Sequence, residues 1–322
     1  MSEAAATAPR RAALWHKLAP WLITAVCFYL WWRRVEGAAA REGIDVATYM
    51  ARVIAAVRWG PWLALMIPYS LLYLVVDTVV LWRVITWFNA PVRLRDVLPV
   101  RASSYILSIV NEQVGKGAIA VYMNRRHGIP GWEVGSSMLF IMFCEFYYLI
   151  SWATLGWFVS GDELPKVFAA IPWVAAAALV FFFAFTEFFG GRFGAGSTLR
   201  ERAIFRAFRI AKRWQYLAVI ALRAPAMLFA IVVYTAAARL FGIEVDLRQM
   251  LGYLPVIFFG AAVPGPMRAV AITLWVVLFP GYEGQVSIFG FLQHNFFVFF
   301  NAAIGLVFLR RAYQELFASE SE

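Results

Sequence analysis

The chain has 322 residues, of which 62% are hydrophobic and 15% are charged, whereas soluble domains average about 45–50% apolar and about 25% charged residues. This composition excludes a soluble globular enzyme and predicts a polytopic α-helical membrane protein. The net charge of +10 comes mainly from Arg and Lys in short segments beside apolar stretches, which indicates anionic lipid head groups rather than nucleic acid as the partner.

A membrane-spanning helix requires about 20 predominantly apolar residues. Six stretches meet or approach this length, and we expect them to cross the membrane: residues 15–32, 59–82, 134–158, 167–189, 214–240 and 286–309. Two further apolar regions, 97–123 and 250–280, are interrupted by breaks at 111–117 and 263–266. Because the arms around each break are short, we predict two re-entrant hairpins whose tips are buried in protein or line a wet cavity.

An internal repeat relates the two halves of the chain. Residues 88–98 match residues 241–251 at a Phe, a Val, two Leu and an Arg, and a Pro-Gly-aromatic-Glu sequence occurs at both 130–133 and 280–283. The predicted organisation is therefore an N-terminal helix and external loop (1–58), membrane repeat 1 (59–160), a connecting helix and basic cytoplasmic loop (161–213), membrane repeat 2 (214–311) and an acidic C-terminal tail (312–322).

The segment 192–213 carries seven Arg or Lys residues against Glu201 alone, and the positive-inside rule therefore places it in the cytoplasm. Counting outward from this loop puts both termini in the cytoplasm and the two hairpins in opposite orientations. The fold class we expect is thus an all-α integral membrane protein of the plasma (inner) membrane, with about six spanning helices and two oppositely oriented re-entrant hairpins in an inverted repeat, a plan common among transporters.

Charged residues in the two breaks are candidates for binding an anionic head group, because a buried charge in a bilayer is costly and helix ends add positive potential. Lys116 lies beside Glu112 in the first break, and Arg268 follows the second. The alternative is that Lys116 pairs with Glu112 and only stabilises the turn. The candidate substrate-binding residues are Asn111, Glu112, Lys116, Gly117, Pro264, Gly265 and Arg268.

Glu145 lies within the third predicted crossing, and its repeat counterpart is His294 or Asn295. These three residues are candidates for proton coupling, and we expect Glu145 and His294 to face one cavity. The alternatives are a neutral, hydrogen-bonded carboxylic acid at Glu145 and an ordinary core histidine.

Three other polar residues lie inside predicted crossings. Asp77 and Arg223 form either a structural ion pair or parts of one pathway. Asn301, like Asn111, is expected to make helix-to-helix hydrogen bonds.

Enzyme motifs are largely missing from the sequence. It contains no nucleotide-binding glycine loop, no Gly-x-Ser-x-Gly sequence and no pair of histidines at metal-ligand spacing. We therefore predict no enzymatic activity, no cofactor and no metal. The two cysteines, Cys27 and Cys144, both lie in apolar stretches, which argues against a disulfide framework or a zinc site.

The run 111–126, which continues to Pro130 with Tyr122-Met123-Asn124-Arg125-Arg126-His127-Gly128-Ile129-Pro130, resembles the first signature of the flippase-like transmembrane domain of the lysylphosphatidylglycerol synthase family. Residues 254–271, with Pro264-Gly265-Pro266-Met267-Arg268, resemble the second signature but lack its usual glycine pairs. The resemblance covers residues 59–311. The cytosolic aminoacyl-transferase domain has no counterpart here, so lysyl transfer is not expected, and the resemblance implies lipid translocation.

The function we expect is that of a lipid transporter or flippase, which moves an anionic phospholipid or a polyprenyl-phosphate-type lipid between leaflets. One alternative is an integral-membrane enzyme of lipid or glycan assembly that uses Glu145, His294 or Asp77 as acid or base. Another is an accessory subunit without transport of its own. The expected partners are membrane lipids, and self-association into a homo-oligomer stays open.

Overall fold

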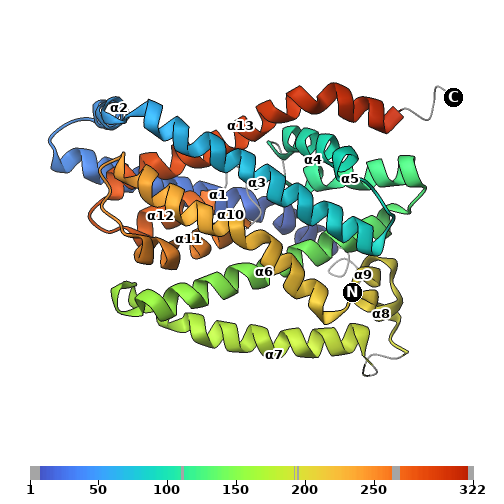
Figure 1. The fold of residues 1–322 in the computed structure, drawn as a ribbon. Helices are drawn as coiled ribbons and strands as arrows, with labels where there is room; N and C mark the ends of the chain where they lie inside the picture. Colours follow the sequence, from blue (N-terminus) through green and yellow to red (C-terminus); the bar gives the residue numbers. More distant parts are fainter. Residues whose placement is uncertain (1–7, 110–111, 192, 194–195, 263–268, 318–322) are drawn as a thin grey trace.

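The computed structural model describes residues 8–109, 112–191, 193, 196–262 and 269–317, and all regular elements in these ranges are helical. Five helices are long and apolar enough to cross a membrane, and they run roughly along one direction (Figure 1). They are α3 (Trp59–Phe88), α6 (Gly131–Ser160), α7 (Ile171–Gly190), α10 (Arg213–Arg239) and α13 (Glu283–Phe317). The prediction of an all-α membrane protein is confirmed.

The first predicted crossing, residues 15–32, belongs to α1 (Ala8–Arg41), which is not among these five helices. Its apolar segment, residues 18–32, is shorter than the length of about 20 residues that a crossing requires, and Arg33 and Arg34 follow directly. The later part of α1 is attached to the start of α13. The indole Nε1–H of Trp31 donates to the Ser287 carbonyl at 3.0 Å.

The shorter helices form two pairs whose members pack against each other. One pair is α4 (Leu94–Ser108) with α5 (Glu112–His127), and the other is α11 (Leu247–Ala262) with α12 (Ala269–Leu278). Figure 1 shows the two pairs toward opposite ends of the bundle. The first predicted break is shorter than expected, because α5 already begins at Glu112 and includes residues 116 and 117. The second predicted break, 263–266, lies outside the described residues.

The loops that join the long helices contain short helices. In the predicted external loop, α2 (Val46–Ala56) is capped at its N-terminus by Asp45, whose side chain accepts a hydrogen bond from the Thr48 backbone N–H at 3.0 Å. A carboxylate at this position satisfies a free N–H of the first helical turn. The basic loop forms α8 (Thr198–Glu201) and α9 (Arg206–Ile210).

Small residues allow helix backbones to approach closely. A Cβ placed on Gly156 of α6 would lie 2.5 Å from the Leu251 carbonyl oxygen of α11, and one on Gly305 of α13 would lie 2.6 Å from the Ala102 carbonyl oxygen of α4. Contacts of this kind are typical of membrane helices, where van der Waals packing contributes most of the association energy.

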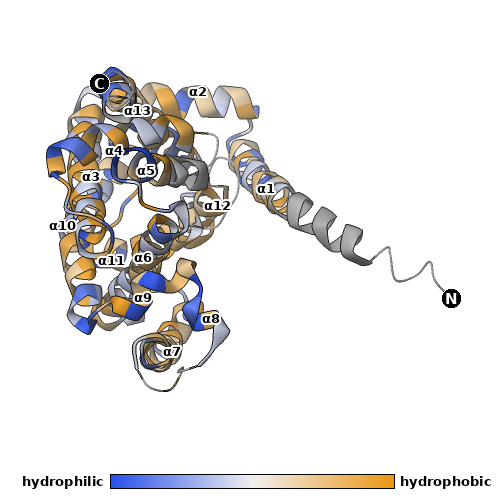
Figure 2. Ribbon diagram, turned by 90° about the vertical axis from the view of Figure 1, so that its right-hand side faces the viewer, coloured by the Kyte–Doolittle hydropathy of each residue, from blue (hydrophilic) through white to orange (hydrophobic). Residues whose placement is uncertain are grey.

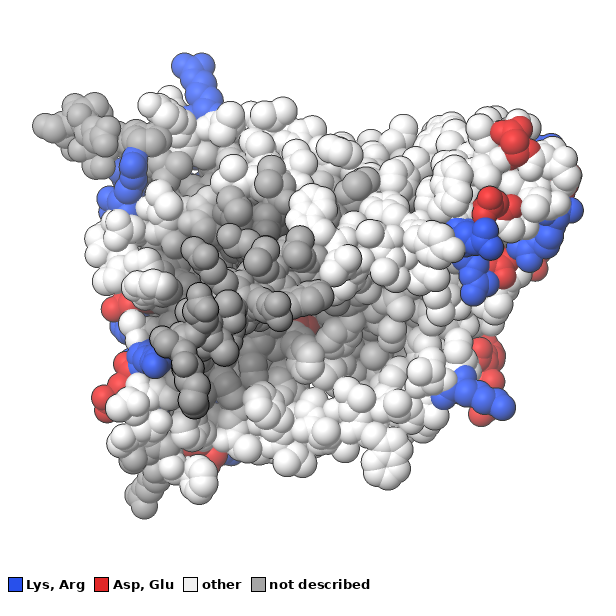
Figure 3. Space-filling model, turned by 180° about the vertical axis from the view of Figure 1, so that it is seen from behind, with Lys and Arg blue, Asp and Glu red and all other residues white. Residues whose placement is uncertain are grey.

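The distribution of surface residues matches a bilayer environment. On the face shown in Figure 3, the charged side chains of the described residues gather at the two ends of the bundle, and the described part of the band between the ends is almost free of them. Apolar residues also cover outward-facing parts of the helices (Figure 2), such as Val75 of α3, Val180 of α7 and Leu217 of α10.

We call the end of the bundle where α3 ends and α6 and α10 begin the basic end. The rings of Trp87 and Trp214, at the end of α3 and the start of α10, lie 5.3 Å apart. Arg206, in the loop before α10, donates to the Phe88 carbonyl and pairs with Glu133 at 3.0 Å. Most of the basic loop's Arg and Lys residues therefore lie at this end.

Candidate functional site

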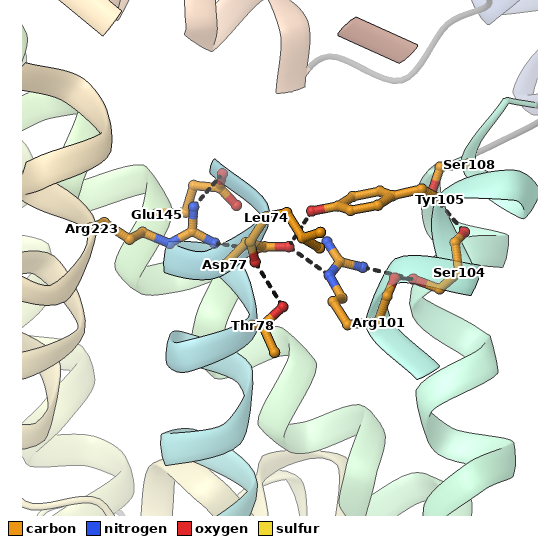
Figure 4. Close-up of polar contacts among 9 residues, drawn as sticks. All are labelled: Leu74, Asp77, Thr78, Arg101, Ser104, Tyr105, Ser108, Glu145 and Arg223. Carbon is orange, nitrogen blue, oxygen red and sulfur yellow. Dashed lines mark hydrogen bonds and ion pairs between the residues drawn. The ribbon is translucent and has the colours of Figure 1, made fainter. Parts of the chain in front are cut away.

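Four helices bring four charged side chains together inside the bundle (Figure 4): Asp77 from α3, Arg101 from α4, Glu145 from α6 and Arg223 from α10. We call this set the charged cluster. Asp77 lies 11 residues before the end of α3, Glu145 14 residues after the start of α6, and Arg223 10 residues after the start of α10. At a rise of about 1.5 Å per residue, these places are about 15–21 Å from the basic end, near the middle of a hydrocarbon core about 30 Å thick.

The Asp77 carboxylate is held on one side by two donors from α4. Arg101 Nε lies 2.5 Å from Asp77 Oδ2, and the Tyr105 hydroxyl donates to the same oxygen at 2.9 Å. The Arg101 guanidinium also donates to Ser104 Oγ at 3.1 Å and lies over the Tyr105 ring at 4.8 Å. Asp77, Arg101 and Tyr105 therefore form a closely bonded unit.

Arg223 connects this unit to Glu145. Its Nη2 lies 3.4 Å from Asp77 Oδ1, and its Nη1 lies 3.2 Å from Glu145 Oε1. Arg223 Nε is buried and has no hydrogen-bond partner among the described residues. The Glu145 side chain is 29% exposed, whereas those of Asp77 and Arg223 are 8% and 6% exposed. The cluster is thus closed at Asp77 and open at Glu145.

A cavity of about 30 Å³ adjoins the charged cluster, which is about the volume of one water molecule. The residues that line it are Tyr73, Asp77, Leu81, Arg101, Ile119, Met138, Ile141, Glu145 and Arg223. With both arginines and both acids ionised, the cluster has no formal net charge. An unpaired charge at the centre of a membrane helix costs at least about 2.5–3.5 kcal/mol, so this balance is what allows four charges to lie there.

The structure thus brings three of the predicted site residues, Asp77, Glu145 and Arg223, into one cluster. His294 is not among the described residues that line this cavity, and the shared cavity expected for Glu145 and His294 stays a prediction. His294 Nε2 accepts from the Trp275 indole N–H at 3.3 Å, on the side of α13 that packs on α12. Equivalent depth in two helices does not fix which way their side chains turn. Asn295 donates to the Phe291 carbonyl of its own helix at 2.7 Å.

Most of the other predicted site residues lie outside the part of the chain that the structure describes. These are residues 111, 264, 265 and 268 and the side chains of residues 112 and 116. Gly117 lies in α5 with open space around it. The interhelical hydrogen bond predicted for Asn301 is not found, since both polar atoms of its buried side chain have no partner among the described residues.

Arg101 is a site residue that the sequence analysis missed. It follows Leu98, Pro99 and Val100 and precedes Ala102, within the apolar region 97–123. A charged residue inside an apolar region indicates a functional or paired position, and that signal was available here. In the described ranges, no group of three or more His, Cys, Asp or Glu side chains is arranged to hold a metal ion.

A comparison of the chain with protein-family models, curated proteins and solved structures finds no match. The fold and the charged cluster define the class directly. The chain is an all-α, multi-pass membrane protein with paired acidic and basic side chains near the middle of its apolar band.

Proposed function

We propose that the protein is a lipid transporter that moves an anionic phospholipid or a polyprenyl-phosphate-type lipid between the leaflets of the plasma (inner) membrane. The observation that carries the proposal is the charged cluster, which lies beside a cavity about halfway along the spanning helices. A lipid that changes leaflet must move its phosphate through hydrocarbon, where a charge is costly unless it is paired. A guanidinium at mid-depth is suited to that task because it binds phosphate through several parallel hydrogen bonds.

The positions of the two short helix pairs support the proposal. The α4–α5 pair and the α11–α12 pair lie toward opposite ends of the bundle (Figure 1). We interpret them as re-entrant hairpins of an inverted repeat, which enter the membrane from opposite sides. Transporters with inverted repeats bind their substrates near the midplane, at the interface between the repeats. In this interpretation Lys116 and Arg268 contact the head group on its way to the cluster.

The basic end lies on the cytoplasmic side in this proposal, because cytoplasmic loops carry an excess of Arg and Lys. Both termini are then cytoplasmic. The acyl chains stay in lipid along the apolar outer faces of the helices, while the head group moves through the protein. This division requires no soluble domain and no nucleotide site.

Reconstitution tests the proposal. The purified protein is placed in vesicles with a fluorescent phosphatidylglycerol, and a membrane-impermeant reductant bleaches the label in the outer leaflet. Vesicles without protein should lose about half of the signal, because only the outer leaflet is accessible. Vesicles with wild-type protein should lose most of it. A fluorescent polyprenyl phosphate is assayed in parallel.

Variants show whether any movement depends on the proposed residues. Arg223→Gln, Lys116→Ala and Arg268→Ala should each slow bleaching of the inner-leaflet lipid. Arg213→Gln, which removes a surface partner of Glu187, should not. If the wild-type protein moves neither lipid, the proposal is wrong, and the result favours the alternative of an accessory subunit without transport of its own. Mass spectrometry of the same vesicles detects any chemical change in the lipid, which would favour the enzyme alternative.

A further inference from the structure

The two ends of the charged cluster differ in how firmly their acids are held. Asp77 receives hydrogen bonds from Arg101 and Tyr105 and an ion pair from Arg223, and its side chain is nearly inaccessible. Among the described residues, Glu145 has one charged partner, Arg223 at 3.2 Å, and it is partly exposed. If an external anion takes the place of one of these acids, Glu145 is the one that leaves at lower cost.

Arg223 has the features of a binding group that is not fully used. Its side chain is 6% exposed, it lines the cavity, and its Nε–H has no partner among the described residues. A buried guanidinium N–H without a partner is costly. A phosphate oxygen at Nη1 would replace the bond to Glu145 with a charge-assisted hydrogen bond. The Nε–H, on another edge of the guanidinium, is a further donor for a second oxygen of the same head group.

Charge balance then decides what happens to Glu145. With both acids ionised, the cluster is neutral, and adding a phosphodiester monoanion would leave one uncompensated negative charge in the membrane interior. Transfer of a proton from a hydronium ion or a buffer acid in the aqueous phase to the Glu145 carboxylate removes that charge and restores neutrality. The donor's bond to the proton breaks, one O–H bond forms on a Glu145 oxygen, and no other covalent bond changes.

From these observations we infer that Arg223 binds the anionic phosphodiester group of the substrate, and that Glu145 is its displaceable counter-ion, which takes up one proton for each monoanion bound. The inference rests on the proposed function for its substrate, a lipid, but it also makes a statement about anion binding alone. Asp77, Arg101 and Tyr105 do not exchange partners and keep Arg223 in position.

The groups around Glu145 allow this assignment. From α10 it faces Arg223, from α3 Asp77 and Tyr73, and from α4 Arg101, all of which line the same cavity. Its neighbours on α6, Cys144 and Tyr148, also lie within electrostatic reach. Helix α5 contributes Ile119 to the lining. Among these groups, Glu145 is the carboxylate with the larger exposure and the fewer donors, so it is the one we expect to change protonation.

Calorimetry of the detergent-solubilised full chain tests the inference. Short-chain phosphatidylglycerol is titrated into the protein in two buffers that have different ionisation heats, which gives the number of protons taken up per lipid bound. A phosphodiester keeps the same charge across the accessible pH range, so any titration belongs to the protein. Wild-type protein should take up one proton per lipid, and its affinity should fall about tenfold per pH unit where Glu145 is ionised in the free protein.

Variants separate the two roles. Glu145→Gln should bind without proton uptake and with an affinity that no longer depends on pH. Glu145→Asp, which keeps a titratable carboxylate, should retain the uptake of one proton. Arg223→Lys keeps the charge but loses the several fixed N–H donors of the guanidinium and should bind at least tenfold more weakly. Glu187→Gln, at a surface pair on α7, is the matched control and should behave as wild type. Size-exclusion chromatography checks that each variant is folded.

The outcomes distinguish this inference from the proposed function. Wild-type binding without proton uptake, or an unchanged pH slope in Glu145→Gln, overturns the exchange, even if lipid transport is observed. Full affinity in Arg223→Lys overturns the assignment of the anion to Arg223. Inorganic phosphate at about pH 5.5, where it is a monoanion, is a second probe. If it binds with uptake of one proton and phosphatidylglycerol does not bind, the exchange stands and the lipid function is contradicted.

Discussion

Asp77→Asn tests whether the charged cluster is held together by charge balance. The substitution keeps the shape of the side chain and removes one negative charge, so the two buried guanidinium groups are left with Glu145 as the one carboxylate among their described partners. Arg101 is affected most, because Asp77 is its only charged partner in the described part of the chain. Removing one partner of a buried ion pair costs about 3–5 kcal/mol, and we expect a loss of unfolding free energy in this range.

The measurement is the unfolding free energy in mixed micelles, followed by the fluorescence of the 14 tryptophans during titration with a denaturing detergent. Asp96→Asn is the matched control. Its side chain is 29% exposed and pairs with Arg95 at 3.6 Å on the surface, so it should cost less than about 1 kcal/mol. A second variant, Asp77→Asn with Arg101→Met, removes the uncompensated charge and should recover most of the lost free energy.

Two results would refute this reasoning. The first is an Asp77→Asn protein that is as stable as the Asp96→Asn protein, since the cluster would then tolerate a net positive charge. The second is a double variant that is less stable than the single variant. The lost hydrogen bonds of Asp77, rather than the uncompensated Arg101, would then account for the cost.

Three further predictions concern packing, topology and coupling. Gly156→Ala should lower the unfolding free energy by about 1–3 kcal/mol, because its Cβ would meet the α11 backbone. Gly60→Ala is the control, since Gly60 has open space around it. Equal stability of the two variants would contradict the close α6–α11 contact. Single cysteines at Gly131 and Gly281, in a background without native cysteines, should react with an impermeant thiol reagent from opposite sides of the membrane, and labelling from one side would exclude the inverted repeat. His294→Gln should leave the proton uptake on anion binding at one per lipid, and a loss of that proton in calorimetry would return His294 to the coupling site.

The positions of the long helices could be predicted from the sequence to within a few residues at most of their ends. The expected crossings 134–158 and 214–240 became Gly131–Ser160 and Arg213–Arg239. A helix is the only open-chain structure that satisfies its own backbone polar groups in lipid, so a long apolar stretch determines its own secondary structure. The predicted crossing at residues 15–32 falls in α1, which is not among the five helices long and apolar enough to span, because its apolar segment is short.

The membership of the charged cluster could not be predicted in full. Asp77 and Arg223 were recognised singly as buried charges, but their pairing remained one of two interpretations, and Arg101 was missed. The partners are far apart in the chain: Asp77 and Arg101 are separated by 24 residues, Glu145 and Arg223 by 78, and Asp77 and Arg223 by 146. Local patterns in the sequence carry no information about contacts of this range.

By itself, then, the sequence determined that the chain is an all-α membrane protein and which of its polar residues lie in apolar stretches. Only the tertiary structure decided which of those residues meet. The physical reason is that helices in a bilayer are apolar on both their lipid-facing and protein-facing sides, so hydrophobic periodicity does not reveal the inward face. Helix rotation and packing through small residues such as Gly156 turn Glu145 toward Arg223 and His294 toward Trp275.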